Sequence, residues 1–106
     1  MAIIDVTIIP IGTQTPSVSE YVADIQRILQ THQEKGHIRY ELTPMNTLIE
    51  GELQTLLSIV QEMHESPFAK GVQRVATNIR IDDRRDRADH SMQNKMASVQ
   101  QKLHKK

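Results

Sequence analysis

The stretch "AIIDVTII", residues 2–9, determines the fold of this chain. Apolar and polar side chains alternate along it: Ile4, Val6 and Ile8 are apolar, and Asp5 and Thr7 are polar. A period of two residues is typical of a β-strand whose two faces have different environments. The apolar face needs a cover, so we expect helices packed on one side of a sheet that contains this strand.

Two segments have apolar side chains at three- and four-residue steps, the spacing of a helix with one apolar face. The first segment follows the break "PIGTQTP" and ends near Gly36. At its start, Ser17 and Glu20 have the spacing of a capping box. Its apolar face contains Val18, Tyr21, Val22, Ile25, Ile28 and Leu29, and that of the second segment contains Leu53, Leu56, Leu57, Val60 and Met63. Pro67 should break or kink the second helix, and Gly71 should let the chain turn back into a strand.

Three further strands are expected at "HIRYEL" (37–42), "TLIEG" (47–51) and "VQRVATNIRI" (72–81), with the turn "TPMN" joining the first two. The order is then β-α-β-β-α-β, followed by a C-terminal helix. Two right-handed split βαβ units predict an α+β, ferredoxin-like domain. Its four-stranded antiparallel sheet has the first and third strands in the centre and both main helices on one face.

This arrangement leaves the other sheet face, with Asp5, Thr7 and Ile9, uncovered by its own helices. Either water covers that face, as in many antiparallel sheets, or a second copy does. The C-terminal helix has a narrow apolar stripe of Met92, Met96, Val99 and Leu103, which could pack on a neighbouring copy or fold back onto its own sheet. We expect a closed symmetric homo-oligomer, a dimer or a dimer of dimers.

Length and composition exclude several classes of protein. With 106 residues, the chain is expected to form one domain, 1–106. Thirteen basic residues balance thirteen acidic ones, and only three aromatic residues occur, so we expect neither nucleic acid nor a membrane as partner. The absence of cysteine excludes thiolate chemistry. The first apolar stretch is too short for a signal peptide or a spanning helix, so a cytoplasmic location is expected.

The stretch "RIDDRRDRAD", residues 80–89, has three interpretations. Asp82, Asp83 and Asp86 could bind a metal ion, but the interleaved arginines are ready bidentate partners for these carboxylates. The alternating charges also weaken the positive potential that phosphate contact requires. We favour a structural corner, with Asp89 capping the C-terminal helix.

No catalytic or cofactor-binding constellation stands out. The five histidines, at positions 32, 37, 64, 90 and 104, have no metal-binding spacing and belong to no nucleophile-base motif. His64 is better explained as a half-buried helix residue than as a general base. We therefore expect a protein that is not an enzyme, with no cofactor and no metal site.

Polar groups gather at one edge of the expected sheet. Thr13, Ser17, Ser19 and the turn at 43–47 lie there, whereas Glu50 and Asp82 lie at the opposite edge. Thr7 and Ile9 should lie beside the strand that carries Thr47 and Glu50, although the register decides which of them share a face. Ordinary turn and capping chemistry is the alternative explanation for the Ser and Thr residues.

Several separated motifs, read in order, resemble the thiamine-binding-protein family over nearly the whole chain. They are "VTIIPIGT", "SVSEYVADI", "LTPMNTLIEGE", "HE" at 64–65, "GVQRVATNIRIDDRRD" and "KMASVQQKL". The resemblance implies a small ferredoxin-like protein, cytoplasmic and usually tetrameric, that binds thiamine or its hydroxymethylpyrimidine moiety without catalysis. The family pattern commonly has Gly where Asn46 stands here.

With this resemblance, the chemistry of thiamine suggests candidate ligand-binding residues. Glu50 could bind the amine or the thiazolium cation, Thr7, Thr43 and Thr47 could supply hydroxyls, and Met45 and Ile9 could supply contact area. Asn46, in the turn, completes the set of candidate ligand-binding residues. Two other classes remain open. One is a structural or regulatory oligomer without a small ligand, and the other is a cofactor-free enzyme, for which the fold alone is no argument.

Overall fold

The computed structural model describes residues 1–86 and 91–104. In chain order, its elements are β1 (Ala2–Ile11), α1 (Ser19–Glu34), β2 (Ile38–Leu42), β3 (Thr47–Gly51), α2 (Leu53–Glu65), the short 3₁₀-helix η1 (Ser66–Lys70), β4 (Arg74–Asp83) and α3 (Met92–His104). Their order confirms the expected β-α-β-β-α-β pattern with an additional C-terminal helix. No helix in these two ranges is long and apolar enough to cross a membrane.

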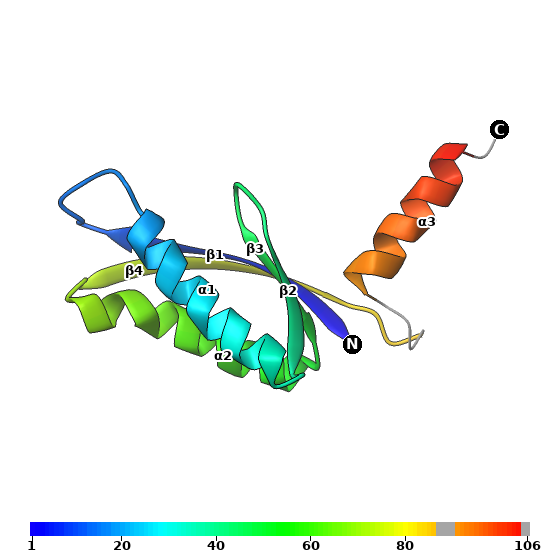
Figure 1. Ribbon diagram of the computed structural model, residues 1–106, viewed down its shortest axis with the longest axis horizontal. Helices are drawn as coiled ribbons and strands as arrows, with labels where there is room; N and C mark the ends of the chain where they lie inside the picture. The colour runs from blue at the N-terminus through cyan, green and yellow to red at the C-terminus, as the bar shows by residue number, and fades with distance from the viewer. Residues whose placement is uncertain (87–90, 105–106) are drawn as a thin grey trace.

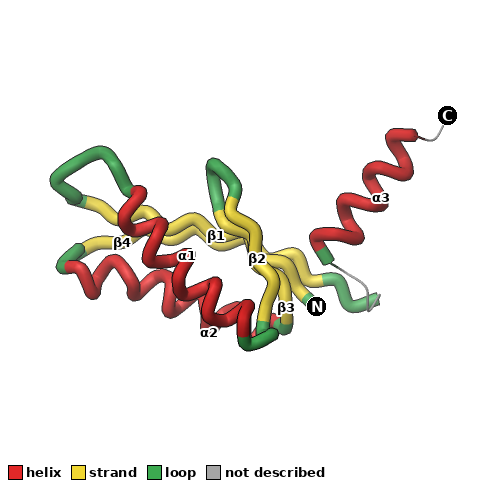
Figure 2. The backbone as a smooth tube through the Cα atoms, viewed as in Figure 1, coloured by secondary structure: helices red, strands yellow, loops and turns green. Residues whose placement is uncertain are grey.

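The four strands form one antiparallel sheet in the order β2-β3-β1-β4, with β1 and β3 central as predicted. Helices α1 and α2 lie on the same face of this sheet, and α3 projects from the end at which β1 begins (Figure 1). The strand pair β1–β4 extends beyond the β2–β3 hairpin (Figure 2). This α+β arrangement is ferredoxin-like.

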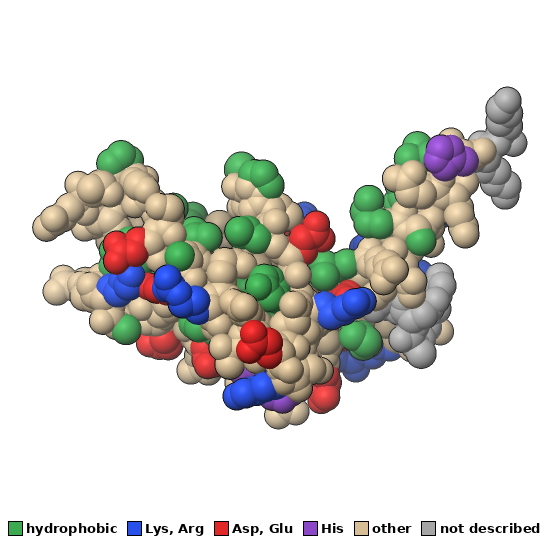
Figure 3. Space-filling model, in the orientation of Figure 1, with side chains coloured by type: hydrophobic (Ala, Val, Ile, Leu, Met, Phe, Trp, Pro, Cys, Tyr) green, Lys and Arg blue, Asp and Glu red, His purple; other side chains and the backbone are tan. Residues whose placement is uncertain are grey.

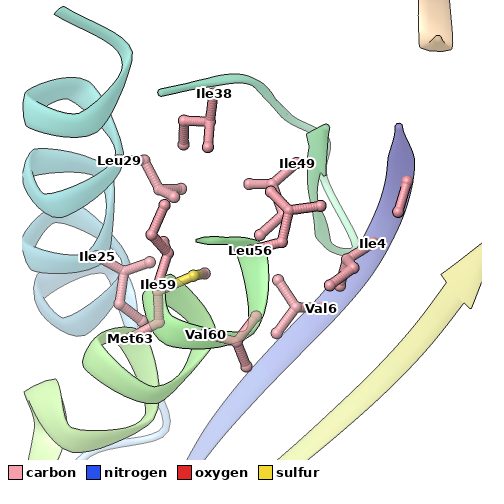
Figure 4. Close-up of a cluster of buried hydrophobic side chains, with 11 residues drawn as sticks. Ile4, Val6, Ile25, Leu29, Ile38, Ile49, Leu56, Ile59, Val60 and Met63 are labelled. Carbon is pink, nitrogen blue, oxygen red and sulfur yellow. The ribbon is translucent and has the colours of Figure 1, made fainter. Parts of the chain in front are cut away.

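A single apolar core lies between the sheet and the two helices. Ile4 and Val6 of β1 and Ile49 of β3 point from the sheet into this cluster, toward side chains of α1 and α2 (Figure 4). The helices contribute Ile25, Leu29, Leu56, Ile59, Val60 and Met63. The alternation in the first strand therefore identified the buried face of the sheet correctly.

The predicted capping box does not form. Val18 occupies the position before the first helical residue, and no side chain caps that helix end. The Ser17 hydroxyl is hydrogen-bonded to the hydroxyl of Ser19, 3.2 Å away, and the Glu20 carboxylate accepts from Lys70 of η1 at 2.7 Å. Glu20 thus joins α1 to η1 because Lys70 is the stronger, charged donor.

Pro67 does end α2, as expected. It lies in the first turn of η1, and Gly71 follows in the left-handed conformation, with φ of 89°. Glycine adopts this backbone conformation without the strain that a Cβ atom would introduce. The chain then enters β4 at Arg74, slightly later than the sequence pattern predicted, and β4 continues to Asp83.

The second face of the sheet is open over much of its area, as predicted. Ile9 and Ile11 of β1 are exposed there, and 43% of the surface of Ile9 is accessible to solvent. Helix α3 does not fold back over this face: none of its described residues is buried, and Met96 and Leu103 are 58% and 70% exposed. The first turn of α3 is anchored, through the Met92 amide to Glu50 and through Lys95 to Asp82.

The Asp/Arg stretch forms ion pairs where it is described. Arg85 binds Asp83 at 2.7 Å, and Arg84 binds Asp86 at 2.6 Å. Arg80 instead reaches Asp5 on the neighbouring strand, also at 2.7 Å. These pairs agree with the structural-corner interpretation. The predicted capping role of Asp89 lies outside the described residues.

Candidate functional site

The main candidate site is a cavity of about 610 Å³ between the second half of β1, the start of α1 and the β2–β3 turn. In the space-filling view, a hollow separates the loop before α1 from the tip of the hairpin (Figure 3). The volume is within the range of small-molecule sites. From here on we call this space the hairpin cavity.

The hairpin cavity exists because β1 is longer than its neighbour. β3 pairs with β1 only from Ala2 to Val6, whereas β4 pairs with β1 from Ala2 to Ile11. One backbone edge of β1 beyond Val6 therefore has no strand partner within the described sheet. Backbone groups on such an edge can donate to and accept from a ligand, much as they would pair with a strand.

The β2–β3 turn is held by the hydroxyl of Thr43 and the side chain of Asn46. The Thr43 hydroxyl accepts a hydrogen bond from the backbone amide of Asn46 at 3.1 Å, and it is also hydrogen-bonded to the side-chain oxygen of Asn46. The Asn46 side-chain amide donates to Asp5 at 2.7 Å, and the other Asp5 oxygen accepts from Arg80. A glycine in place of Asn46 could not make this bridge from the turn to β1.

Gln26 supplies a polar group that has no partner in the described part of the chain. This residue lies on α1 and lines the hairpin cavity, and its side-chain nitrogen, Nε2, is buried without any hydrogen bond among the described residues. Leaving a buried donor unsatisfied costs about 1–3 kcal/mol. Such a group is rare in folded proteins, and its place on a residue that lines the hairpin cavity makes it a candidate donor for a ligand.

None of the described residues that line the hairpin cavity has a charged side chain. The walls combine aliphatic residues, among them Val22 and Met63, with the hydroxyl and amide side chains of Thr, Ser, Gln and Asn. A cation placed deep in this space would lose hydration without gaining a carboxylate. A neutral ring with several donors and acceptors suits these walls better.

Six of the seven predicted ligand-binding residues line the hairpin cavity. They are Thr7, Ile9, Thr43, Met45, Asn46 and Thr47. Thr47 is paired with Val6 on the helix-covered face, whereas Thr7 and Ile9 have the opposite alternation on β1. Their ligand-binding roles remain predictions. The hydroxyl of Thr43 is already used within the turn, as the turn-chemistry alternative required.

Glu50 lies outside the hairpin cavity. It pairs with Ile3 near the opposite end of the sheet, is only 2% exposed, and accepts the backbone amide of Met92 at 2.7 Å. A carboxylate at this position stabilises the start of α3 by satisfying a free amide and opposing the positive helix end. Glu50 and Thr47 are three residues apart on β3 and therefore have opposite alternation, and the expected topology also puts Glu50 at the edge away from the turn.

Sequence reasoning missed Gln26. A glutamine within an amphipathic helix has no motif that distinguishes it from a solvated one, and only the packing of α1 against β1 reveals its buried amide. His64, by contrast, lies where expected: it is half-buried, its Nδ1 atom is 2.7 Å from the Thr77 hydroxyl, and its ring packs edge-on against Phe68.

Comparisons with known proteins agree with this fold. The chain is 63% identical to the UPF0045 protein YqgV of Bacillus subtilis over 103 residues, which covers 97% of this chain and 98% of that protein. The crystal structure of the hypothetical protein MJ1052 from Methanocaldococcus jannaschii superposes with a TM-score of 0.79 at 28% identity, covering 93% of this chain and 95% of the other.

A Thermotoga maritima protein, assigned provisionally to thiamine biosynthesis or salvage, has a TM-score of 0.73 with coverage of 92% of this chain and 97% of its own. At 16% identity, this likeness concerns the fold. The sequence profile of the thiamine-binding protein family matches residues 4–100, and the chain therefore belongs to that family.

Proposed function

We propose that this protein is a non-catalytic binding protein that holds hydroxymethylpyrimidine, or the pyrimidine end of thiamine, in the hairpin cavity. The carrying observation is the buried side-chain nitrogen of Gln26, which has no hydrogen-bond partner among the described residues and belongs to a residue that lines a cavity of suitable size. An aminopyrimidine has ring nitrogens that accept hydrogen bonds, so one of them would satisfy the Gln26 donor. Membership of the thiamine-binding protein family supports this choice of ligand.

The uncharged walls favour the pyrimidine over the thiazolium as the buried part. The thiazolium cation would remain at the mouth, where Met45 is 83% exposed and Leu42 is also exposed. These side chains provide soft, apolar contact area without removing the positive charge from water. In this arrangement the hydroxyls of Thr7 and Thr47 and the unpaired edge of β1 are further hydrogen-bonding groups.

The protein acts as a homo-oligomer in this proposal, with a dimer of dimers as the expected form, and the oligomer completes the walls of the pocket. The exposed stripe of Met96, Val99 and Leu103 on α3, together with Ile9 and Ile11 on the open sheet face, supports this part. Packing these side chains on a second copy would remove apolar surface from water. The corresponding test is light scattering at micromolar concentration on wild type and on a Met96→Lys, Leu103→Lys variant.

Calorimetric titration tests the ligand. Purified, tag-free protein is titrated separately with hydroxymethylpyrimidine, thiamine and thiamine phosphate. We expect saturable binding of the pyrimidine and of thiamine, with affinity at least tenfold weaker in Gln26→Met. Gln30→Met is the matched control, since Gln30 is an exposed glutamine one turn further along the same helix.

The alternative function is a structural or regulatory oligomer without a small ligand, which the exposed apolar stripe of α3 favours. No saturable binding of any of the three compounds, with the oligomer intact by light scattering, would establish this alternative and refute the proposal. Equal affinities of Gln26→Met and Gln30→Met would place the ligand elsewhere.

A further inference from the structure

A second cluster of polar side chains lies at the far end of α1, away from the hairpin cavity. His32 of α1 and His37, just before β2, place their Nδ1 atoms 3.5 Å apart, and Glu62 of α2 lies 2.6 Å from Nε2 of His32. His37 is exposed and His32 is half-buried, so water and ions reach the pair. The spacing of these histidines in the sequence matches no metal-binding motif.

The chain reversal at Gly36 creates this contact. Gly36 has φ of 77°, its amide donates to Gln33, and the next amide, that of His37, donates to the carbonyl of His32 at 3.1 Å. These two bonds define a Schellman motif, which brings together the side chains three residues before the helix cap and two residues after it. An apolar pair usually occupies these positions, and here both are histidines.

The geometry of the pair suits a bound cation better than a hydrogen bond. A separation of 3.5 Å is long for a hydrogen bond between nitrogens. Two imidazole nitrogens bound to one tetrahedral Zn²⁺, each about 2.0–2.1 Å from the metal, are about 3.4 Å apart. The ring centroids are 5.8 Å apart, so the two Nδ1 atoms lie between the rings and face each other.

Glu62 prepares His32 for this role. Its carboxylate is an acceptor, so Nε2 of His32 carries the donated proton and Nδ1 of the neutral ring keeps its lone pair, directed toward His37. A carboxylate on the second ring nitrogen is the usual outer partner of a metal-binding histidine, because it fixes the tautomer and makes the ligand more basic.

We propose that His32 and His37 bind a divalent transition-metal ion of the Zn²⁺ or Cu²⁺ type through their Nδ1 atoms, with Glu62 as the carboxylate that orients His32. Imidazole ligands favour these ions over Mg²⁺ or Ca²⁺. The described residues include no cluster of three or more histidines or carboxylates suited to a metal, so water completes the coordination. The site is separate from the hairpin cavity and does not depend on the proposed ligand.

Competition with a chromophoric zinc chelator tests the site on tag-free protein at pH 7.5. We expect one Zn²⁺ per chain, with affinity at least tenfold weaker in His37→Gln and about 10–100-fold weaker in Glu62→Gln. His104→Gln is the matched control and should bind Zn²⁺ like wild type, because His104 lies at the exposed end of α3. Circular dichroism verifies that each variant is folded.

Nuclear magnetic resonance of wild type gives a second measurement that needs no variant. On addition of Zn²⁺, the ¹⁵N resonances of Nδ1, not Nε2, should shift for two of the five histidines. Coordination through Nε2, loss of binding in His104→Gln, or equal affinities of wild type and His37→Gln would each overturn the proposal, and the pair would then be a structural contact.

Discussion

Replacing Gln26 with methionine should stabilise the unliganded protein. The buried Nε2 atom has no acceptor among the described residues, and an unsatisfied buried donor costs about 1–3 kcal/mol. Methionine keeps the length and flexibility of the side chain and brings no polar hydrogen to bury. Allowing for imperfect packing, we expect a gain of about 1 kcal/mol, which corresponds to a melting temperature higher by about 4–8 °C.

Equilibrium urea unfolding, followed by circular dichroism because the chain has no tryptophan, measures this gain. Gln30→Met on the exposed side of α1 is the matched control, with an expected change within about 0.5 kcal/mol. The reasoning is refuted if Gln26→Met is less stable than Gln30→Met, because the amide would then have a partner in the native state. Stability and affinity for the pyrimidine should move in opposite directions in Gln26→Met, which a simple packing change would not produce.

Three further predictions concern other parts of the molecule. Glu50→Gln should leave the calorimetric affinity for thiamine within about twofold of wild type, because Glu50 lies outside the hairpin cavity. A tenfold loss of affinity, which corresponds to about 1.4 kcal/mol of binding free energy, would return Glu50 to the binding site. Gly36→Ala should lower the free energy of unfolding in urea by about 1–2 kcal/mol, because alanine is strained at φ of 77° although its Cβ would meet no neighbour; an unchanged midpoint would contradict this. A hydrogen bond from Lys70 holds the pKa of the Asp24 carboxyl below its usual value, so its contribution to stability is present above the pKa of the unfolded carboxyl and is lost as the pH falls through the depressed one. Asp24→Asn should therefore be less stable than wild type at pH 7 in urea titrations, and the difference should vanish in acid; a difference that persists there would disprove the assignment.

The fold was predictable from local patterns because burial imposes them. The alternation at Ile4 and Val6 identified the covered face of the sheet, and the helical stripe that includes Leu56 and Met63 identified the face of α2 that packs on it. The turn at Gly71 followed from its conformational freedom. Capping was less predictable, because the long-range donor Lys70 binds Glu20 in place of the expected local backbone amide.

The candidate site was predictable only in part. The hairpin residues Met45 and Asn46 and the strand residue Thr7 do meet in one cavity, since the antiparallel pairing of β3 with β1 brings the turn beside the middle of β1. Glu50 was grouped with them because an amine or a thiazolium cation favours a carboxylate, although the expected topology already put Glu50 at the opposite edge of the sheet. Gln26 was missed because the burial of one amide depends on how a helix packs.

The sequence by itself determined the order of elements, the covered face of the sheet and the family, because periodic burial and turn chemistry are written into neighbouring residues. Only the tertiary structure decided which groups from distant segments meet. The docking of the first turn of α3 gave the Glu50 carboxylate a partner in the Met92 amide, and the packing of α1 buried the side-chain nitrogen of Gln26. The reversal at Gly36 placed His37 against His32 beside Glu62, because contacts between segments follow from the geometry of the whole chain.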